Sequence, residues 1–167
     1  MSEFLAPLNY DRAHNALRRL SAYTSYTPEG ARLALDALRG CYPLVFSKTE
    51  PKAFENGAVL LELRGASVTE PLVFTSHLDV EQGVAACDRL FAHELPMSVP
   101  LSRAHGVALL EALEELLRDG FRPGGDLFLA LSMDGLSGGA GARSMAGHLQ
   151  ARSVTPCFVL DYGGYAT

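Results

Sequence analysis

Three stretches of the sequence place imidazole or carboxylate side chains directly after an apolar run. His77 and Asp79 follow PLVFTS, Asp134 follows DLFLALSM, and Asp161 follows CFVL. These side chains are the usual ligands of a hydrolytic metal and the usual general acids and bases beside it. Each residue taken singly has a structural alternative, because Asp is also favoured in turns and at helix caps. Together the three stretches indicate a site at one edge of a sheet.

The pair His77 and Asp79 is the most specific of these features. A carboxylate behind a metal-bound imidazole fixes its tautomer and raises its basicity, which gives a physical reason for the spacing H-x-D. Ligand sites of open α/β sheets lie at the carboxyl ends of strands, where this pair is expected. Alone, a histidine at a strand end is more often a hydrogen-bonded structural residue.

Nucleophilic catalysis has weaker support in the sequence. Ser76 adjoins His77 and Ser132 lies near the same edge, but no G-x-S-x-G segment is present. Cys87 has no histidine in a diagnostic relation to it. The glycine cluster over 135–141 matches neither the P-loop nor the dinucleotide fingerprint, so we predict no nucleotide site.

Hydrophobic periodicity and cap residues predict the elements that must position these side chains. Helices are expected over Tyr10–Tyr23 with Asp11 as N-cap, from Pro28 to a stop at Gly40 with Thr27 as N-cap, over Arg103–Asp119 with Ser102 as N-cap, and up to about Ala151. Strands are expected over Tyr42–Ser47, Ala58–Leu63, Pro71–Thr75, Asp126–Ser132 and Cys157–Leu160, with a loop over 81–101. This alternation predicts an α/β fold, a three-layer α/β/α sandwich with a mixed, mostly parallel sheet, in one domain over residues 1–167.

Composition excludes several classes of function. The 167 residues carry 14 basic and 19 acidic side chains, a net charge of −5 and no run of Lys or Arg, so a dedicated nucleic-acid binder is not expected. The apolar runs are far shorter than the ~20 residues of a membrane span, and the N-terminus lacks a signal-peptide pattern, so we expect a cytoplasmic protein. Cys41, Cys87 and Cys157 form no CxxC pair, so neither disulfides nor a cysteine zinc site is expected.

The motifs, in this order and spacing, resemble those of the co-catalytic zinc hydrolases, which include aminoacylases, carboxypeptidase S and succinyl-diaminopimelate desuccinylases. PLVFTSHLDV resembles the first metal motif of that family, and FVLDYGG resembles the carboxypeptidase S form of a later one. Between them, the long helix, the turn GFRP, the strand DLFLALS and the acidic motif stand in register over about 85 residues. The resemblance implies a zinc-aminopeptidase type of sandwich, matching the N-terminal part of the catalytic domain without the lid domain.

The resemblance also implies roles for the matched residues. His77 corresponds to a zinc ligand, Asp79 to the residue that orients it, and Asp161 to a second ligand of the same zinc. The bridging aspartate of the family corresponds to Arg103, so a cation stands where a carboxylate would join two metals. In the acidic motif, Gly135 replaces the general base and Leu136 replaces a ligand of the other zinc.

The implied metal site is therefore incomplete, because catalytic zinc usually has three protein ligands and a water. His105 is a candidate substitute ligand, although a helix-surface or hydrogen-bonded histidine is the plainer interpretation. Arg103 is expected to form an ion pair with Asp79 or Asp161, or to create a small anion pocket. The other histidines, His14, His93 and His148, are expected on solvated faces.

We therefore expect a metallopeptidase-like or amidohydrolase-like protein that has lost its dinuclear zinc site, with no cofactor, or zinc if any metal is bound. Whether the chain is an enzyme stays open at this stage. It would be a non-catalytic binding or structural subunit, with a small carboxylate or peptide ligand near Arg103 and Asp134. The alternative is an active peptidase or N-acyl amino acid hydrolase, with a rearranged single-metal site or a site completed by another chain. Since the family's final histidine ligand lies beyond the matched part, we expect a homodimer or a partner chain to cover the remaining apolar surface.

Overall fold

The computed structural model describes residues 9–23, 27–79, 101–136 and 138–161. Five helices and five strands alternate along these residues. In chain order they are α1 (Tyr10–Ser21), α2 (Pro28–Cys41), α3 (Pro43–Lys48), β1 (Glu50–Ala53), β2 (Val59–Leu63), β3 (Ser67–His77), α4 (Leu101–Arg118), β4 (Gly125–Ser132), α5 (Ala140–Ala151) and β5 (Phe158–Asp161). No helix among the described residues is long and apolar enough to cross a membrane.

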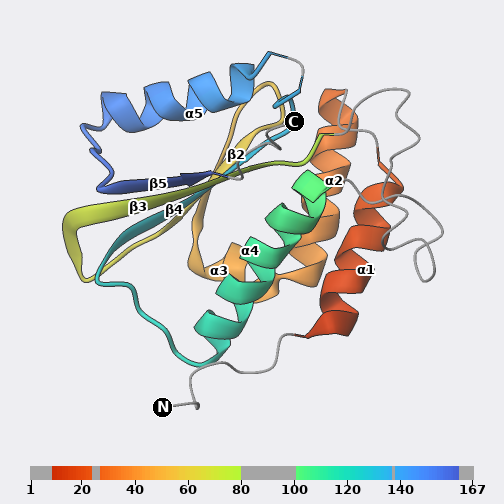
Figure 1. Cartoon of the computed structure of the whole chain (residues 1–167), viewed down its shortest axis with the longest axis horizontal. Helices are drawn as coiled ribbons and strands as arrows, with labels where there is room; N and C mark the ends of the chain where they lie inside the picture. Colours follow the sequence, from red (N-terminus) through yellow and green to blue (C-terminus); the bar gives the residue numbers. More distant parts are fainter. Residues whose placement is uncertain (1–8, 24–26, 80–100, 137, 162–167) are drawn as a thin grey trace, which may run out of the picture.

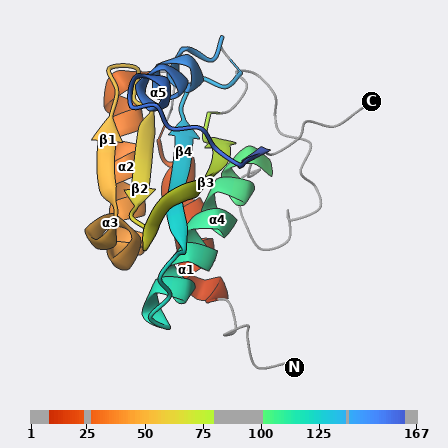
Figure 2. The same cartoon turned by 90° about the vertical axis from the view of Figure 1, so that its left-hand side faces the viewer.

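The strands form one mixed sheet between two layers of helices, which confirms the predicted α/β/α class. The strand order is β1-β2-β4-β3-β5. Strand β2 runs antiparallel to β1 and β4, whereas β3 runs parallel to β4 and β5, so all described strands except β2 point the same way. Helices α1 to α4 cover one face of the sheet and α5 covers the other (Figures 1 and 2).

Each face of the sheet has its own hydrophobic core. Along β4, Leu129 and Leu131 point into the core beneath α1 to α4, while Phe128 and Ala130 point into the core beneath α5. This alternation follows from the two-residue period of a strand. It explains why the central strands read as continuous apolar runs, because both of their faces are buried.

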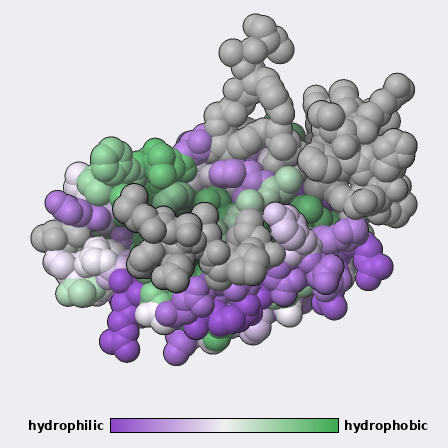
Figure 3. Space-filling view, turned by 60° about the horizontal axis from the view of Figure 1, so that its bottom comes forward, coloured by the Kyte–Doolittle hydropathy of each residue, from purple (hydrophilic) through white to green (hydrophobic). Residues whose placement is uncertain are grey.

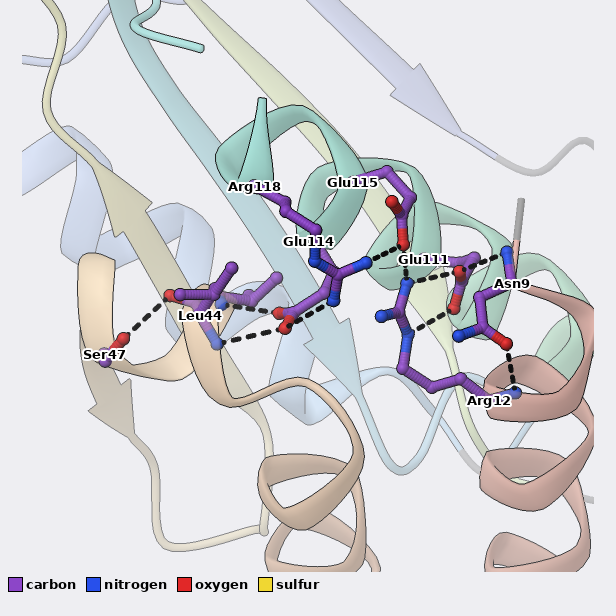
Figure 4. A network of polar contacts seen from close by, with 9 residues as sticks. Asn9, Arg12, Leu44, Ser47, Glu111, Glu114, Glu115 and Arg118 are labelled. Carbon is purple, nitrogen blue, oxygen red and sulfur yellow. Dashed lines mark hydrogen bonds and ion pairs between the residues drawn. The ribbon is translucent and has the colours of Figure 1, made fainter. Parts of the chain in front are cut away.

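Helix α3 overturns one prediction, because its segment YPLVFS reads as a strand. Pro43 occupies the first turn of the helix, where its missing N–H costs nothing. The carboxylate of Glu114 on α4 accepts hydrogen bonds from the backbone N–H groups of Leu44 (3.2 Å) and Val45 (2.9 Å) (Figure 4). A carboxylate from a distant helix therefore supplies the N-terminal cap that α3 lacks locally.

The sequence analysis did not predict strand β1, whose four residues are all exposed.

Two helix starts also differ from the prediction. The side chain of Asn9, not Asp11, caps α1 by accepting a hydrogen bond from the N–H of Arg12. Helix α4 begins at Leu101, so Ser102 lies inside its first turn. Helix α2 begins as predicted, with Thr27 as N-cap.

Buried charges join α1 to α4. The guanidinium of Arg12 donates from Nε to Oε2 of Glu111 (2.9 Å) and also contacts Glu115 (Figure 4). Burial alone would lower the pKa of Arg12, but the hydrogen bonds to the two carboxylates outweigh it and raise that pKa. Arg118 donates to Glu115 as well, at 2.5 Å. The side chains of Arg12 and Glu111 are only 12% and 2% exposed, so this is an interior ion pair.

Candidate functional site

His77 and Asp79 lie at the carboxyl end of β3, at the edge of the sheet where a ligand site is expected. Nδ1 of His77 lies 2.9 Å from Oδ1 of Asp79. The aspartate is fully buried, while the histidine side chain is about one quarter exposed. Because the carboxylate holds Nδ1, the Nε2 atom of His77 remains as the nitrogen able to bind a ligand.

Asp79 also binds the backbone of the turn that follows β4. Its carboxylate accepts hydrogen bonds from the backbone N–H groups of Gly135 (3.0 Å) and Leu136 (2.7 Å). Burial raises the pKa of Asp79, but the hydrogen bonds from His77 and Leu136 outweigh it and lower the pKa below 3.8. These contacts fasten the end of β3 to the β4–α5 turn.

Gly135, which the resemblance aligns with a general base, packs against His77. A Cβ atom added to Gly135 would lie 2.6 Å from Cβ and 2.7 Å from Cγ of His77. Real side chains do not approach this closely, so residue 135 cannot carry a larger side chain unless the imidazole or the turn moves. In this turn conformation, only a glycine fits at residue 135 without displacing the imidazole of His77.

Arg103, which the resemblance aligns with a bridging carboxylate, is 3% exposed. Its guanidinium donates to the backbone carbonyls of Leu78 (2.8 Å), Leu20 (2.7 Å) and Tyr23 (3.1 Å). These three hydrogen bonds tie the end of β3 to the end of α1. The ion pair of Arg103 with Asp79 or Asp161 that the sequence suggested stays a prediction.

His105 lies one turn into α4 and faces the same edge. Its Nδ1 atom is 3.3 Å from Oγ of Ser76, whose hydroxyl donates to the carbonyl of Ser102. Burial lowers the pKa of His105; the carboxylate of Asp161 raises it and the nearby His77 lowers it further. His105 therefore lies at the same edge of the sheet as His77, which follows Ser76 in the chain.

Asp161 ends β5, and one of its carboxylate oxygens accepts a hydrogen bond from the Thr75 hydroxyl. Strand β5 pairs with β3 so that Thr75 and Asp161 are direct neighbours. The Asp161 side chain is exposed, in contrast to Asp79. It borders a cavity of about 870 Å³ between α5 and the sheet.

That cavity is the feature that the sequence analysis missed. Polar groups from Thr75, His77, Ser132 and Asp161 line part of it. Most of the remaining wall is apolar and comes from Val73, Ala130, Ala142, Met145, Ala146, Leu149, Val154, Pro156 and Val159. The sequence signal was the apolar face of α5, formed by Ala142, Met145, Ala146 and Leu149, from which only a helix was predicted.

Asp134 acts as a helix cap rather than facing a ligand. Both of its carboxylate oxygens accept a hydrogen bond from the N–H of Gly141, at 3.1 and 3.0 Å, in the first turn of α5. The other end of α5 is held by Arg152, which forms two hydrogen bonds to Glu62 at 2.6 and 2.8 Å. These contacts hold both ends of α5, the helix that covers the cavity.

In the part of the chain that the structure describes, no three His, Cys, Asp or Glu side chains are grouped so that they could hold a metal ion. The correspondence of Arg103 and Gly135 to two further groups of a family zinc site stays a prediction from the resemblance. His93 and Cys87 lie outside the described residues, while Cys41 is buried and Cys157 exposed.

The hydrogen bonds to Asp79 predict a stability effect that depends on pH. We expect Asp79→Asn to lower the free energy of unfolding by about 1–3 kcal/mol at pH 7, because two backbone donors and His77 lose a carboxylate. Since the folded pKa of Asp79 is depressed, this stabilisation is complete above the unfolded pKa near 3.9 and is lost as the pH falls through the folded pKa. Urea unfolding from pH 7 down to pH 2.5 measures it.

The matched control is Asp36→Asn, since Asp36 is about half exposed on α2. That variant should change stability by less than about 0.5 kcal/mol. An Asp79→Asn deficit that stays constant down to pH 2.5 would contradict the role given to the carboxylate.

Comparison with solved structures finds the same fold in parts of several peptidases. The chain resembles a tripeptidase of Staphylococcus aureus (TM-score 0.64, 17% identity, 96% of this chain and 45% of that one) and human carnosine dipeptidase 1 (TM-score 0.64, 12% identity, 93% and 39%). It also resembles an M20 family metallo-carboxypeptidase of Sulfolobus solfataricus (TM-score 0.59, 14% identity, 96% and 38%). The chain spans less than half the length of each of these proteins.

Sequence comparison gives a partial match. A segment of 59 residues is 41% identical to the human N-fatty-acyl-amino acid synthase/hydrolase PM20D1. The matched segment covers 35% of this chain and 12% of that protein. No family model matches the sequence. The resemblance drawn from the motifs is nevertheless confirmed by the fold: the chain is similar to the M20-type zinc peptidases and shares part of their α/β architecture.

Proposed function

We propose that this chain is a metallopeptidase-like protein that has lost hydrolysis and acts as a non-catalytic binding or structural subunit. The observation that carries the proposal is the turn at residues 134–136. Its backbone is bound by Asp79, and Gly135 is packed against His77, so the turn offers no space for a general base. Two further predictions belong to this proposal: residues 1–167 form one domain, and the protein is cytoplasmic.

The buried guanidinium of Arg103 supports the same proposal. A cation at this depth opposes a nearby divalent metal, and the three carbonyls that it binds give it a structural role instead. In an active relative, a metal would polarise the scissile carbonyl and activate a water. Among the described residues, the two that the resemblance assigns to zinc, His77 and Asp161, are too few protein ligands for a catalytic site.

The cavity beneath α5 is a better candidate ligand site than Arg103. Its volume of about 870 Å³ lies within the usual range of ligand sites, and polar groups occupy one part of an otherwise apolar wall. This combination suits a small peptide or an acylated carboxylate whose polar group lies near His77. The similarity to a protein that handles N-fatty-acyl amino acids favours the acylated class.

One observation favours the alternative of an active hydrolase. Nδ1 of His105 lies 3.3 Å from Oγ of Ser76, and Asp161 pairs with Thr75 on the neighbouring strand, so His77, His105 and Asp161 come from the same edge of the sheet. The alternative is a rearranged single-metal site that uses these three side chains. A second chain could also complete the site.

Metal content decides between the two functions. The protein is purified without chelator, dialysed against zinc, then freed of unbound metal and subjected to elemental analysis. The proposal expects well under 0.1 zinc per chain and no release of amino acids from N-acyl amino acids or dipeptides. His77→Ala is the site variant, and His14→Ala, on the exposed face of α1, is its control.

Near-stoichiometric zinc that is lost in His77→Ala but kept in His14→Ala would overturn the proposal. Hydrolysis that disappears with the same variant would establish the alternative. Zinc retained equally by both variants would show binding elsewhere, and would leave the sheet edge without a catalytic metal.

A further inference from the structure

The turn between β1 and β2, residues 54–58, contains the dipeptide Asn56-Gly57. Strands β1 and β2 lie at the edge of the sheet opposite β5 (Figure 2). Exposed apolar side chains gather on the β5 side of the molecule (Figure 3), whereas all four residues of β1 are exposed and two of them are charged. The turn packs against α2 and α5, and both helices belong to the described residues.

Three hydrogen bonds fold this turn back on itself. The N–H of Phe54 donates to the carbonyl of Ala58 (2.9 Å), and the N–H of Gly57 donates to the carbonyl of Phe54 (2.9 Å). The N–H of Ala58 donates to Oδ1 of Asn56 (3.3 Å). This last bond is the turn that an asparagine side chain often forms with the backbone two residues later. It holds the carboxamide of Asn56 beside the peptide bond that joins Asn56 to Gly57.

Packing requires glycine at residue 57. The φ angle of Gly57 is +82°, in the left-handed region that residues with a side chain rarely adopt. A Cβ atom at this position would also lie only 2.4 Å from Cβ of Ala31 on α2. The backbone nitrogen that follows Asn56 therefore belongs to a residue without a side chain, so nothing on that residue hinders its approach to Cγ of Asn56.

We propose that Asn56 is a site of spontaneous deamidation in the folded protein, and that its isoaspartyl product displaces the turn from α2 and α5. In the first step, the backbone nitrogen of Gly57 attacks Cγ of Asn56. The N–Cγ bond forms and the Cγ–Nδ2 bond breaks, and Nδ2 leaves as ammonia with the proton of the attacking nitrogen. Water then opens the succinimide ring at either carbonyl, which gives aspartate or isoaspartate. The reaction consumes water, releases ammonia and needs no other reactant.

The hydrogen bond at Oδ1 favours the first step. As the nitrogen adds to Cγ, negative charge develops on Oδ1, the oxygen that already accepts the hydrogen bond from Ala58. A donor fixed beside the atom where charge develops lowers the barrier of such an addition. The hydrogen bond from Gly57 to Phe54 has the opposite effect, because the nitrogen must leave this carbonyl before it attacks. We therefore expect the reaction to be slower in the protein than in a free peptide, but to proceed without global unfolding.

The isoaspartyl product disturbs the packing on both sides of the turn. It routes the main chain through Cβ of residue 56, so the turn gains one backbone atom. Toward α2, Gly57 has no room to move, because Ala31 already lies against it. Toward α5, Nδ2 of Asn56 and Oδ1 of Asp134 lie 3.3 and 2.7 Å from the point where a Cβ of Gly141 would be. The extra atom therefore has to be accommodated by movement of the turn away from one or both helices.

This inference goes beyond the proposed function and does not depend on it, since none of the reacting atoms belongs to the edge around His77. The zinc content and the hydrolytic activity of the protein have no influence on it.

Peptide mapping after incubation at pH 8.5 and 37 °C tests the modification. Trypsin releases residues 53–64, which contain Asn56 and no other asparagine. We expect this peptide to gain the mass that replacement of NH2 by OH adds, and to elute with synthetic aspartyl and isoaspartyl standards. An unincubated sample corrects for reaction during the digestion.

The chain offers matched controls for this experiment. Asn9 and Asn15 precede residues that carry a side chain, so they should stay unchanged over the same time. Asn56→Ser should show no modification, while its hydroxyl can still accept the hydrogen bond from Ala58. Conversion of Asn9 and Asn15 at the rate of Asn56 would overturn the proposal, and so would a native protein that stays unmodified while the free peptide 53–64 reacts completely.

A variant that is destabilised elsewhere separates reaction in the native turn from reaction in the unfolded chain. Arg12→Met removes the ion pairs between α1 and α4, and we expect it to leave the deamidation rate of Asn56 unchanged. A rate that rises in proportion to the unfolded fraction of this variant would show that Asn56 reacts only after global unfolding. That result would overturn the proposal.

Urea unfolding of the separated products tests the structural consequence. We expect the isoaspartyl protein to unfold at a lower urea concentration than the unmodified protein. Asn56→Asp should stay close to the unmodified protein, because its carboxylate keeps the hydrogen bond from Ala58 while the like charge of Asp134 opposes it. An isoaspartyl form with an unchanged midpoint would overturn the proposed displacement of the turn.

Discussion

Replacing Arg103 with aspartate, the residue that the resemblance to the zinc hydrolases implies at this position, is expected to lower the free energy of unfolding by about 3–5 kcal/mol. The substitution removes the donor of hydrogen bonds to the carbonyls of Leu78, Leu20 and Tyr23. It also buries a carboxylate beside the same carbonyl oxygens, without the bond partners that a buried charge needs. We therefore expect Arg103→Asp to destabilise the fold, whether or not the new carboxylate can bind a metal ion.

Guanidinium chloride unfolding at pH 7 measures this loss. Arg103→Lys keeps the charge but not the planar fork of donors, so it should lose about 1–2 kcal/mol. Arg122→Asp makes the same change of charge at an exposed position and should cost less than about 0.5 kcal/mol. An Arg103→Asp variant that is as stable as the parent and gains zinc would contradict the structural role of Arg103.

Replacing Arg12 with methionine is the second change with a large expected effect, again about 3–5 kcal/mol of unfolding free energy. Glu111 loses its cation and stays in an interior where its side chain is only 2% exposed. Glu115 keeps a contact with Arg118, so most of the cost arises at Glu111. Helix α1 also loses its ion pairs to Glu111 and Glu115 of α4.

The double variant Arg12→Met/Glu111→Gln tests whether the uncompensated carboxylate causes the loss. It should recover more than 1 kcal/mol relative to Arg12→Met, because it removes the unpaired charge. Arg18→Met is the control, since Arg18 is exposed on the same helix. Equal stability of the single and double variants would show that packing, not charge, accounts for the effect.

The sequence predicted the fold well wherever the signal is local. The caps and periodicity of α2 and the apolar runs of β2, β3 and β4 lie at or near their predicted positions. Helix α3 was mistaken for a strand because its decisive group, the carboxylate of Glu114, is 70 residues away in the sequence. Strand β1 carries no apolar pattern, and it forms only because β2 offers it a free edge.

Residue types at the site were predicted better than their contacts. The spacing of His77 and Asp79 indicated a hydrogen-bonded pair, which the structure shows. It gave no sign that Asp79 also binds the turn at Gly135, because that contact depends on how β3 and β4 are paired. The partners of Arg103 were missed for a similar reason, since backbone carbonyls carry no residue-specific signal.

The long-range cap of α3 has a consequence for synthesis on the ribosome. Residues 43–48 are translated 70 residues before Glu114, which at 5–20 residues per second corresponds to a delay of roughly 4–14 s. Arg12 is translated 99 residues before Glu111, so the delay before its carboxylate partner is present is longer still. During this interval a nascent chain holds a six-residue helix segment without its cap, an arginine without its carboxylates, and a strongly β-forming sequence, YPLVFS. Helix α4 therefore acts as the element whose arrival commits the N-terminal half to its native structure, and a chain released before residue 118 would be prone to β-aggregation.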